Sequence, residues 1–415
     1  MTDTTSAPMI ALGRPRWTAI TAVGLLLLVI AAALAAYTRQ VTTGLAVTGL
    51  NTPVYWGLYV VNFIFFIGLS AGGVIVASLV HAFGLREFRP VARIAELMAI
   101  ACLLLAMSFI LLDLGRPDRM LFLLRHGRLQ SPLIWDVTVV NAYLVISLTY
   151  GYFGTRADLV RAATAYPRRR GLYRLLALGY MDVSPPALER DHRILRALAM
   201  VGLVGAIALH TVTAWILGLV QARPGWYGAI MAPLFIVSAT VSGLALLLVS
   251  VVFCRRALGL PIEARVVRSL GRLLAFAIPV LGYFLFAELL TVLYAREPAA
   301  LRVFEEMMFG RYAAVFWGNL VLGLVVPMAL LLVALFRAST SDALIGLAAA
   351  LVVLGVLAER WNIVIPPLVG FAHLPYPPGR YTPTAIELLL VAGVYALGGL
   401  LFTLAARVLP LVESE

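Results

Sequence analysis

The stretch YWGLYVVNFIFFIGLSAGGVIVASLV, residues 55–80, decides the fold. It runs for 26 residues without a charged side chain and without the alternation of a half-buried strand. A helix needs about 20 apolar residues to cross roughly 30 Å of hydrocarbon, whereas a membrane strand needs about 10 that alternate. The stretch therefore predicts a transmembrane helix.

Similar apolar runs follow on both sides of this stretch. The chain is 62% hydrophobic and 13% charged, with a mean hydropathy of +0.98, which lies outside the usual range of soluble globular proteins. We expect an all-α polytopic membrane protein with ten transmembrane helices, at residues 17–38, 55–83, 91–113, 133–154, 194–220, 229–253, 271–294, 312–336, 343–359 and 384–407.

The ten helices are expected to form a single membrane domain over residues 1–415. A shift of 170 residues aligns Trp56 with Trp226, Phe65 with Phe235 and Gly73 with Gly243, which indicates two parallel four-helix repeats. The expected parts are a polar tail at 1–16, a first bundle at 55–154 and 194–220, a second bundle at 229–359, and flanking helices at 17–38 and 384–407.

The charge distribution bears on orientation. The net charge is +12 and all 32 basic residues are arginine, 21 of them on the side that both termini share. Because cytoplasmic loops are enriched in basic residues, both termini are expected in the cytoplasm. The segment 155–193, which carries many of these arginines, is expected to be the longest loop and to face the cytoplasm. An alternative reading of the first helix is a signal peptide, since Arg14 and Arg16 precede its apolar run.

Several titratable residues stand at helix ends or within helices, where they are expensive and often functional. The expected site residues at the non-cytoplasmic interface are Asp113, Asp136, Glu359, Arg360 and Glu387, with Glu288 and His210 within helices.

The two cysteines, Cys102 and Cys254, have no CxxC context and are expected to be packing residues.

Short motifs in a fixed order carry a family resemblance. They are WG at 56–57, GLSAG at 68–72, DLGRP at 113–117, SPLIWDV at 131–137, HTV at 210–212, PGW at 224–226, ER at 359–360, and YTPT with Glu387. The chain resembles the NrfD/PsrC family of polysulfide-reductase-type membrane subunits, and within it the ten-helix branch of alternative complex III and DsrP. Members of the alternative-complex group often have histidine where this chain has Ser70.

The resemblance implies a subunit without haem or an iron–sulfur cluster that binds menaquinone or ubiquinone near the outer face. It also implies a docked periplasmic ferredoxin-like iron–sulfur subunit, with a molybdopterin enzyme or a multihaem cytochrome beyond it, in the bacterial inner (plasma) membrane. No nucleic acid and no metal site is expected. Proton handling would fall to Asp113, Asp136, His210, Glu288, Glu359 and Glu387, and quinone binding to Ser70, His210, Arg116, Trp135 and Arg360.

Quinone chemistry moves two electrons and two protons, so such a site needs an apolar slot, hydrogen-bond donors and carboxylates. Three other classes stay open. A haem-b cytochrome would need facing histidines, for which only His81 and His210 are available. A haem-free structural anchor and a secondary transporter are the remaining alternatives, and the expected position of the acids near one interface fits a transporter less well.

Overall fold

The computed structural model describes residues 17–337, 342–369, 379–409 and 411, so the predicted tail at 1–16 lies outside the described residues. Ten helices in this part of the chain are long and apolar enough to cross a membrane, and the prediction of an all-α polytopic membrane protein is confirmed. They are α1 (Trp17–Thr43), α2 (Leu58–Ala77), α3 (Arg89–Asp113), α5 (Pro132–Ala165), α7 (Pro185–Gly218), α8 (Met231–Ala257), α9 (Ala264–Ala295), α11 (Ala313–Leu320) continued by α12 (Val326–Phe336), α13 (Asp342–Val364) and α15 (Ala385–Val408).

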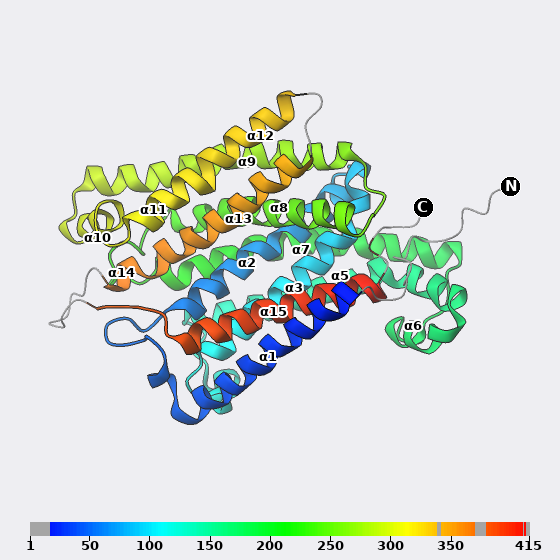
Figure 1. Ribbon diagram of the computed structural model, residues 1–415, viewed down its shortest axis with the longest axis horizontal. Helices are drawn as coiled ribbons and strands as arrows, with labels where there is room; N and C mark the ends of the chain where they lie inside the picture. The colour runs from blue at the N-terminus through cyan, green and yellow to red at the C-terminus, as the bar shows by residue number, and fades with distance from the viewer. Residues whose placement is uncertain (1–16, 338–341, 370–378, 410, 412–415) are drawn as a thin grey trace.

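The helices pack in two sets of four with a flanking pair. In the first set α2, α3, α5 and α7 contact one another in a ring, and in the second set α8, α9, α11–α12 and α13 do the same. The flanking helices α1 and α15 lie side by side, and α15 packs against α3 (Figure 1). We call these sets the first and second bundle. Most of α2 is buried, because it contacts helices of both bundles.

The two bundles meet where α2 crosses α8. A Cβ atom on Gly72 would lie 2.5 Å from the Gly243 carbonyl oxygen, so only a residue without a side chain fits this crossing. Near the ends of the same helices, the Trp56 and Trp226 rings stack with centroids 5.6 Å apart. Small residues let helices approach closely in a membrane, where no hydrophobic force drives them together. The GLSAGG stretch therefore forms the central contact of the molecule.

The two ends of the bundles differ in character. One end carries α10 (Pro298–Met308), α14 (Pro366–Val369) and the DLGRP motif, and we call it the DLGRP end. The other end carries α6 (Arg170–Leu176) and the arginine-rich segment 155–193, and we call it the arginine-rich end. Figure 1 shows α10 and α14 at one end of the long axis and α6 at the other.

The segment 155–193 departs from the prediction of a loop. Instead α5 continues to Ala165, and α7 begins at Pro185. Ion pairs stabilise these extensions, since Arg156 pairs with Asp191 between α5 and α7, and Arg93 Nη2 lies 3.0 Å from Asp158 Oδ2. A small apolar core outside the main one adds to them, made of Leu159, Val160, Ala162, Ala163, Tyr173 and Ala177.

Candidate functional site

A buried ion pair on α13 lies at the centre of the candidate site. Arg360 Nη1 is 3.5 Å from Glu359 Oε1, and both side chains are at most 3% exposed. The Ser238 hydroxyl on α8 bridges the pair, donating to Glu359 Oε2 and accepting from Arg360 Nη2, each at 2.8 Å. Charged groups at this depth are costly unless they are paired and hydrogen-bonded. The pair therefore indicates a functional centre.

A cavity of about 200 Å³ opens beside this ion pair, between α9, α10, α11 and α13. Its wall is apolar and partly aromatic, with four polar side chains among the apolar ones. Ligand sites commonly combine an apolar slot with a few placed polar groups. The polar lining residues are Glu288, Asn319, Glu359 and Asn362, and the aromatic ones are Phe286, Phe304 and Phe316.

Several polar atoms at this cavity have no hydrogen-bond partner among the described residues. Asn362 is 4% exposed, and neither its Oδ1 nor its Nδ2 is hydrogen-bonded within the described chain. The same holds for Glu359 Oε1 and for Arg360 Nε and Nη1, apart from the ion pair itself. A buried polar atom without a partner costs about 1–3 kcal/mol, so such atoms are normally satisfied. Asn362 and Glu359 line the cavity wall, so their unpartnered atoms predict a polar ligand atom there.

A second cavity adjoins this one on the side of the DLGRP end. It measures about 320 Å³ and shares Gly225, Glu288 and Phe304 with the first. Glu297 and Tyr227 line it, and the Tyr227 hydroxyl donates to the Glu297 carboxylate at 2.6 Å, which raises the pKa of Tyr227. Glu288 thus stands between the two cavities, where a carboxyl can pass a proton between them.

His210 and Ser70 lie together in the first bundle. The Ser70 hydroxyl donates to the Ile67 carbonyl at 2.7 Å, and His210 Nε2 lies 3.3 Å from the same oxygen. His210 Nδ1 is 2.6 Å from the Ala206 carbonyl. Ser70 and one ring nitrogen of His210 can therefore donate to backbone carbonyls, and neither residue lines the cavity.

Asp136 is held by a neighbour from the same bundle. The Thr213 hydroxyl on α7 donates to Asp136 Oδ1 at 2.6 Å, and Asp136 is 2% exposed. Thr213 lies one helical turn from His210, so both face the interior of the first bundle. Trp135, which precedes Asp136, points elsewhere, since its ring contacts Trp215 edge-on and its Nε1 donates to the Leu129 carbonyl.

Glu387 and Asp113 form a separate group at the DLGRP end. Glu387 caps α15 in a capping box with Thr384 and accepts further hydrogen bonds from the Tyr381 hydroxyl at 2.6 Å and the Gly49 amide at 2.7 Å. Asp113 lies within electrostatic range of Glu387. No hydrogen bond or ion pair joins this group to Glu359 or Arg360 in the described part of the chain.

Arg116 does not pair with Asp113, although it follows in the same motif. It pairs instead with Asp118, at 3.0 Å, and both side chains are more than half exposed. The Arg116 guanidinium lowers the pKa of the Asp118 carboxyl. An exposed pair of this kind contributes little to stability. The structure thus gives Arg116 a surface position at the DLGRP end.

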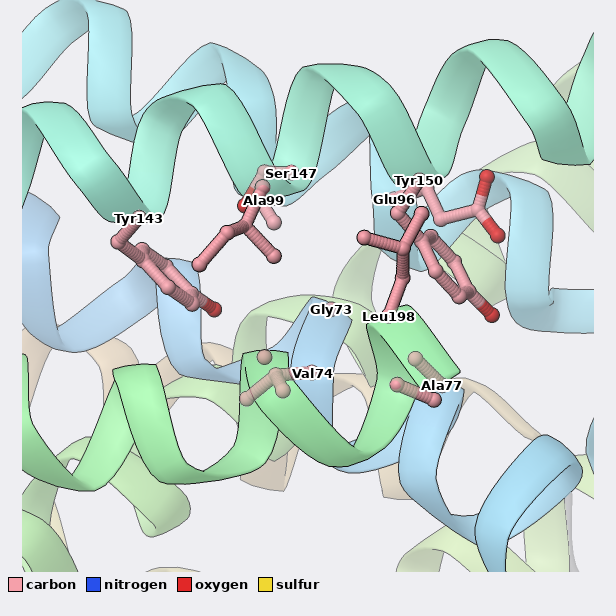
Figure 2. Close-up of a pocket in the computed structure, with 12 residues that line it drawn as sticks. Gly73, Val74, Ala77, Glu96, Ala99, Tyr143, Ser147, Tyr150 and Leu198 are labelled. Carbon is pink, nitrogen blue, oxygen red and sulfur yellow. The ribbon is translucent and has the colours of Figure 1, made fainter. Parts of the chain in front are cut away.

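The interior of the first bundle holds a much smaller cavity. It measures about 30 Å³, room for about one water molecule. Figure 2 shows Tyr143 at one end of it and Glu96 with Tyr150 at the other. The Tyr150 hydroxyl lies 2.7 Å from His81 Nδ1. A flat ring system does not fit here.

A comparison with known families decides the classification. A profile of the polysulphide reductase NrfD family matches residues 46–372, most of the chain and eight of the ten membrane helices that the structure describes. The chain belongs to the NrfD family. The resemblance predicted from the short motifs is therefore confirmed, and this NrfD protein is a multi-pass membrane protein.

Three relatives align with nearly the whole NrfD chain. A putative membrane subunit of dimethyl sulfoxide reductase from Halobacterium salinarum is 32% identical, over 94% of this chain and 91% of its own length. One of the subunits of selenate reductase from Mesobacillus selenatarsenatis is 29% identical, over 91% of this chain and 90% of its own length. An Hdr-like menaquinol oxidoreductase integral membrane subunit of Archaeoglobus fulgidus is 27% identical, over 92% of this chain and 91% of its own length.

Three polar residues of this NrfD chain were not among the site candidates predicted from the sequence. Asn362 follows Glu359 by three positions and so lies on the same face of α13, a spacing that was available as a signal. Glu96 interrupts the apolar run of α3 and was likewise readable as an intramembrane acid. Ser238 gave no signal, because a serine in a membrane helix commonly bonds its own backbone.

Proposed function

We propose that this NrfD protein is the quinone- or quinol-reactive membrane subunit of a multisubunit oxidoreductase, with the quinone ring in the cavity beside Glu359 and Arg360. The unpartnered amide of Asn362 at the cavity wall is the observation that carries the proposal. An amide offers both a donor and an acceptor, and a quinone carbonyl needs a donor while a quinol hydroxyl needs an acceptor. The naming of relatives as reductase and menaquinol oxidoreductase subunits supports the same class of function.

The polar residues of the cavity take separate roles in this proposal. Asn362 orients the quinone by a hydrogen bond to one of the two ring oxygens. Glu359 exchanges a proton with the ring, and Arg360 fixes the Glu359 carboxylate through the ion pair and the shared Ser238 hydroxyl. Phe304 and Phe316 flank the ring, because both line the cavity and aromatic faces pack against a flat ring.

Glu288 carries protons between the site and water in this proposal. It lines both cavities, and the second one reaches the Tyr227–Glu297 hydrogen bond near the DLGRP end. Protons of the quinone reaction would therefore exchange with the side of the membrane at the DLGRP end.

The remaining predicted site residues are assigned positioning roles. Ser70 and His210 meet at the Ile67 carbonyl, next to Gly68, which faces Arg360: a Cβ atom on Gly68 would lie 3.6 Å from Arg360 Nη2. Asp136 and Glu387 hold helix contacts at the DLGRP end, and Asp113 lies at the same end with its Oδ1 atom unpartnered within the described chain. Trp135 and Arg116 lie at the surface of that end, where they can contact a partner subunit.

The proposed orientation puts the DLGRP end outside the plasma membrane, because most arginines lie at the opposite end. A periplasmic-side iron–sulfur subunit would dock on this end. Exposed apolar side chains in the segment that follows the DLGRP motif supply a surface for it, since apolar groups on a loop outside the membrane are uncommon without a partner. They are Met120, Leu121, Phe122 and Leu129.

The test is quinone binding by an Asn362→Leu variant of the full chain. Purified protein in detergent is titrated with a short-chain menaquinone, and binding is followed by quenching of tryptophan fluorescence. We expect Asn362→Leu to weaken binding at least about tenfold, the loss of one well-placed hydrogen bond in a buried site. Asn141→Leu is the matched control, because Asn141 is exposed on α5 and its side chain donates to its own helix. Equal affinity of the two variants would contradict the proposal.

A further inference from the structure

A large recess lies at the arginine-rich end, away from the proposed quinone site. It measures about 740 Å³ and is enclosed by the start of α3, the outer part of α5, the first turns of α7 and the segment between α8 and α9. Basic side chains dominate its charged lining. The basic lining residues are Arg86, Arg89, Arg93, Arg161 and His192, and the acidic ones are Asp158, Asp191 and Glu263.

The acidic residues of the recess are already paired with arginines other than Arg86 and Arg89. Asp158 lies 3.0 Å from Arg93 and 3.3 Å from Arg161. Asp191 pairs with Arg156, which does not line the recess. Glu263 lies 3.6 Å from Arg265, which is also outside it. The carboxylates therefore do not neutralise the remaining cations.

Arg86 and Arg89 are the cations left over. Neither makes an ion pair with any residue that the structure describes, and both are exposed at the start of the third membrane helix. They stand three positions apart, and Arg93 follows one turn after Arg89 on α3, so all three face the recess. Two unpaired guanidinium groups over a pocket can grip the oxygens of a phosphate.

The recess also has an apolar wall at the depth where the membrane begins. Phe153, Leu188 and Leu195 line it together with Pro90 and Pro261. The third membrane helix begins at Arg86 and the seventh at Ala264, so the recess lies at the level of the lipid headgroups. A free anion needs no apolar wall, whereas a phospholipid brings a glycerol and acyl chains next to its phosphate.

We propose that this recess binds the phosphate headgroup of an anionic phospholipid, with Arg86 and Arg89 on the phosphate oxygens. Basic pockets between membrane helices suit such headgroups. The bound lipid would fill the gap between the first bundle and the α8–α9 segment. It would thereby hold the two bundles in register at the arginine-rich end, the end opposite the quinone cavity.

The experiment uses the full chain purified in detergent and compares three additions: phosphatidylglycerol, phosphatidylcholine and inorganic phosphate. Native mass spectrometry counts the retained lipids, and thermal unfolding measures the stabilisation. We expect phosphatidylglycerol alone to be retained and to raise the unfolding temperature. Equal retention of phosphatidylcholine, or the same stabilisation by inorganic phosphate, would overturn the assignment to an anionic lipid.

Two variants locate the lipid in the recess. Arg86→Gln with Arg89→Gln removes the unpaired cations, and Ala157→Phe fills the recess without a change of charge. We expect the double arginine variant to weaken phosphatidylglycerol retention about tenfold or more, because both cations that would hold the phosphate are lost. We expect Ala157→Phe to weaken retention to a similar extent, because its ring takes up the space of the lipid. Arg168→Gln with Arg169→Gln is the control, because these exposed arginines lie outside the recess. An equal loss in the control would overturn the proposal, since net charge alone would then explain binding.

Discussion

Particular buried polar groups in the two bundles of this NrfD protein are held differently. In the first bundle Asp136 is bonded by Thr213, and both ring nitrogens of His210 face backbone carbonyls. In the second bundle the Asn362 amide is unpartnered within the described chain and faces a cavity. Paired groups fix helix positions, and unpartnered groups beside a cavity are available to a ligand. On this criterion Asp136 is a structural group, whereas Asn362 is the group available to a ligand.

The largest expected effect comes from breaking the ion pair of the second bundle. Arg360→Leu leaves the buried Glu359 carboxylate without its cation, which destabilises by about 3–5 kcal/mol. Replacing both residues by leucine should restore part of the loss, because no uncompensated charge remains. Thermal unfolding in detergent measures both variants.

A matched substitution tests whether burial is the cause. Arg116→Leu removes the cation of an exposed pair with Asp118 and should leave the unfolding temperature unchanged. If Arg360→Leu were as stable as Arg116→Leu, the ion pair would not organise the second bundle.

Removing the carboxyl between the two cavities should act on turnover. Glu288→Gln keeps the shape of the wall but cannot pass a proton, and we expect quinol-linked turnover of the assembled complex to fall about 100-fold. Binding of quinone should persist, so the loss falls on kcat and not on KM. Glu297→Gln, in the outer cavity, should have a smaller effect, because Glu297 lies nearer water. A Glu288→Gln complex with full turnover would remove Glu288 from the proton route.

A substitution at the α2–α8 crossing tests the contact between the two bundles. Gly72→Ala would put a methyl group 2.5 Å from the Gly243 carbonyl, and forcing α2 and α8 apart should cost about 1–3 kcal/mol of stability. Gly24→Ala is the control, since a Cβ on Gly24 in α1 meets no atom within 4 Å. The same unfolding temperature for both variants would show that α2 and α8 can separate at no cost.

The smallest effect is expected in the network at the DLGRP end. Thr384→Ala removes the cap of α15 and should lower stability by about 1 kcal/mol without changing turnover. Unfolding temperature and kcat are measured on the same preparation. A loss of turnover at unchanged stability would instead make Glu387 and its neighbours part of the reaction site.

The sequence predicted the number and order of the membrane helices, because long apolar runs have few other structures available to them. The prediction of a loop at the arginine-rich segment was wrong, because α5 and α7 extend into it. Side-chain pairs such as Arg156 with Asp191 stabilise these extensions, and they join residues 35 positions apart in the sequence. The prediction from the sequence also grouped Asp113, Asp136, Glu359 and Glu387 by their depth alone. The depth of a residue in the membrane does not determine the direction in which its side chain points around the helix. Only the packing of the helices shows which of these residues lie together.

Labelling with a photoreactive quinone tests the location of the site most directly. The assembled complex is illuminated with an azidoquinone, and the labelled peptides are identified by mass spectrometry, with excess menaquinone as competitor. We predict competed labels on α10, α11 and α13, at the cavity lined by Phe304, Phe316 and Asn362. Competed labels confined to α2 and α3 would place the quinone in the first bundle and contradict it.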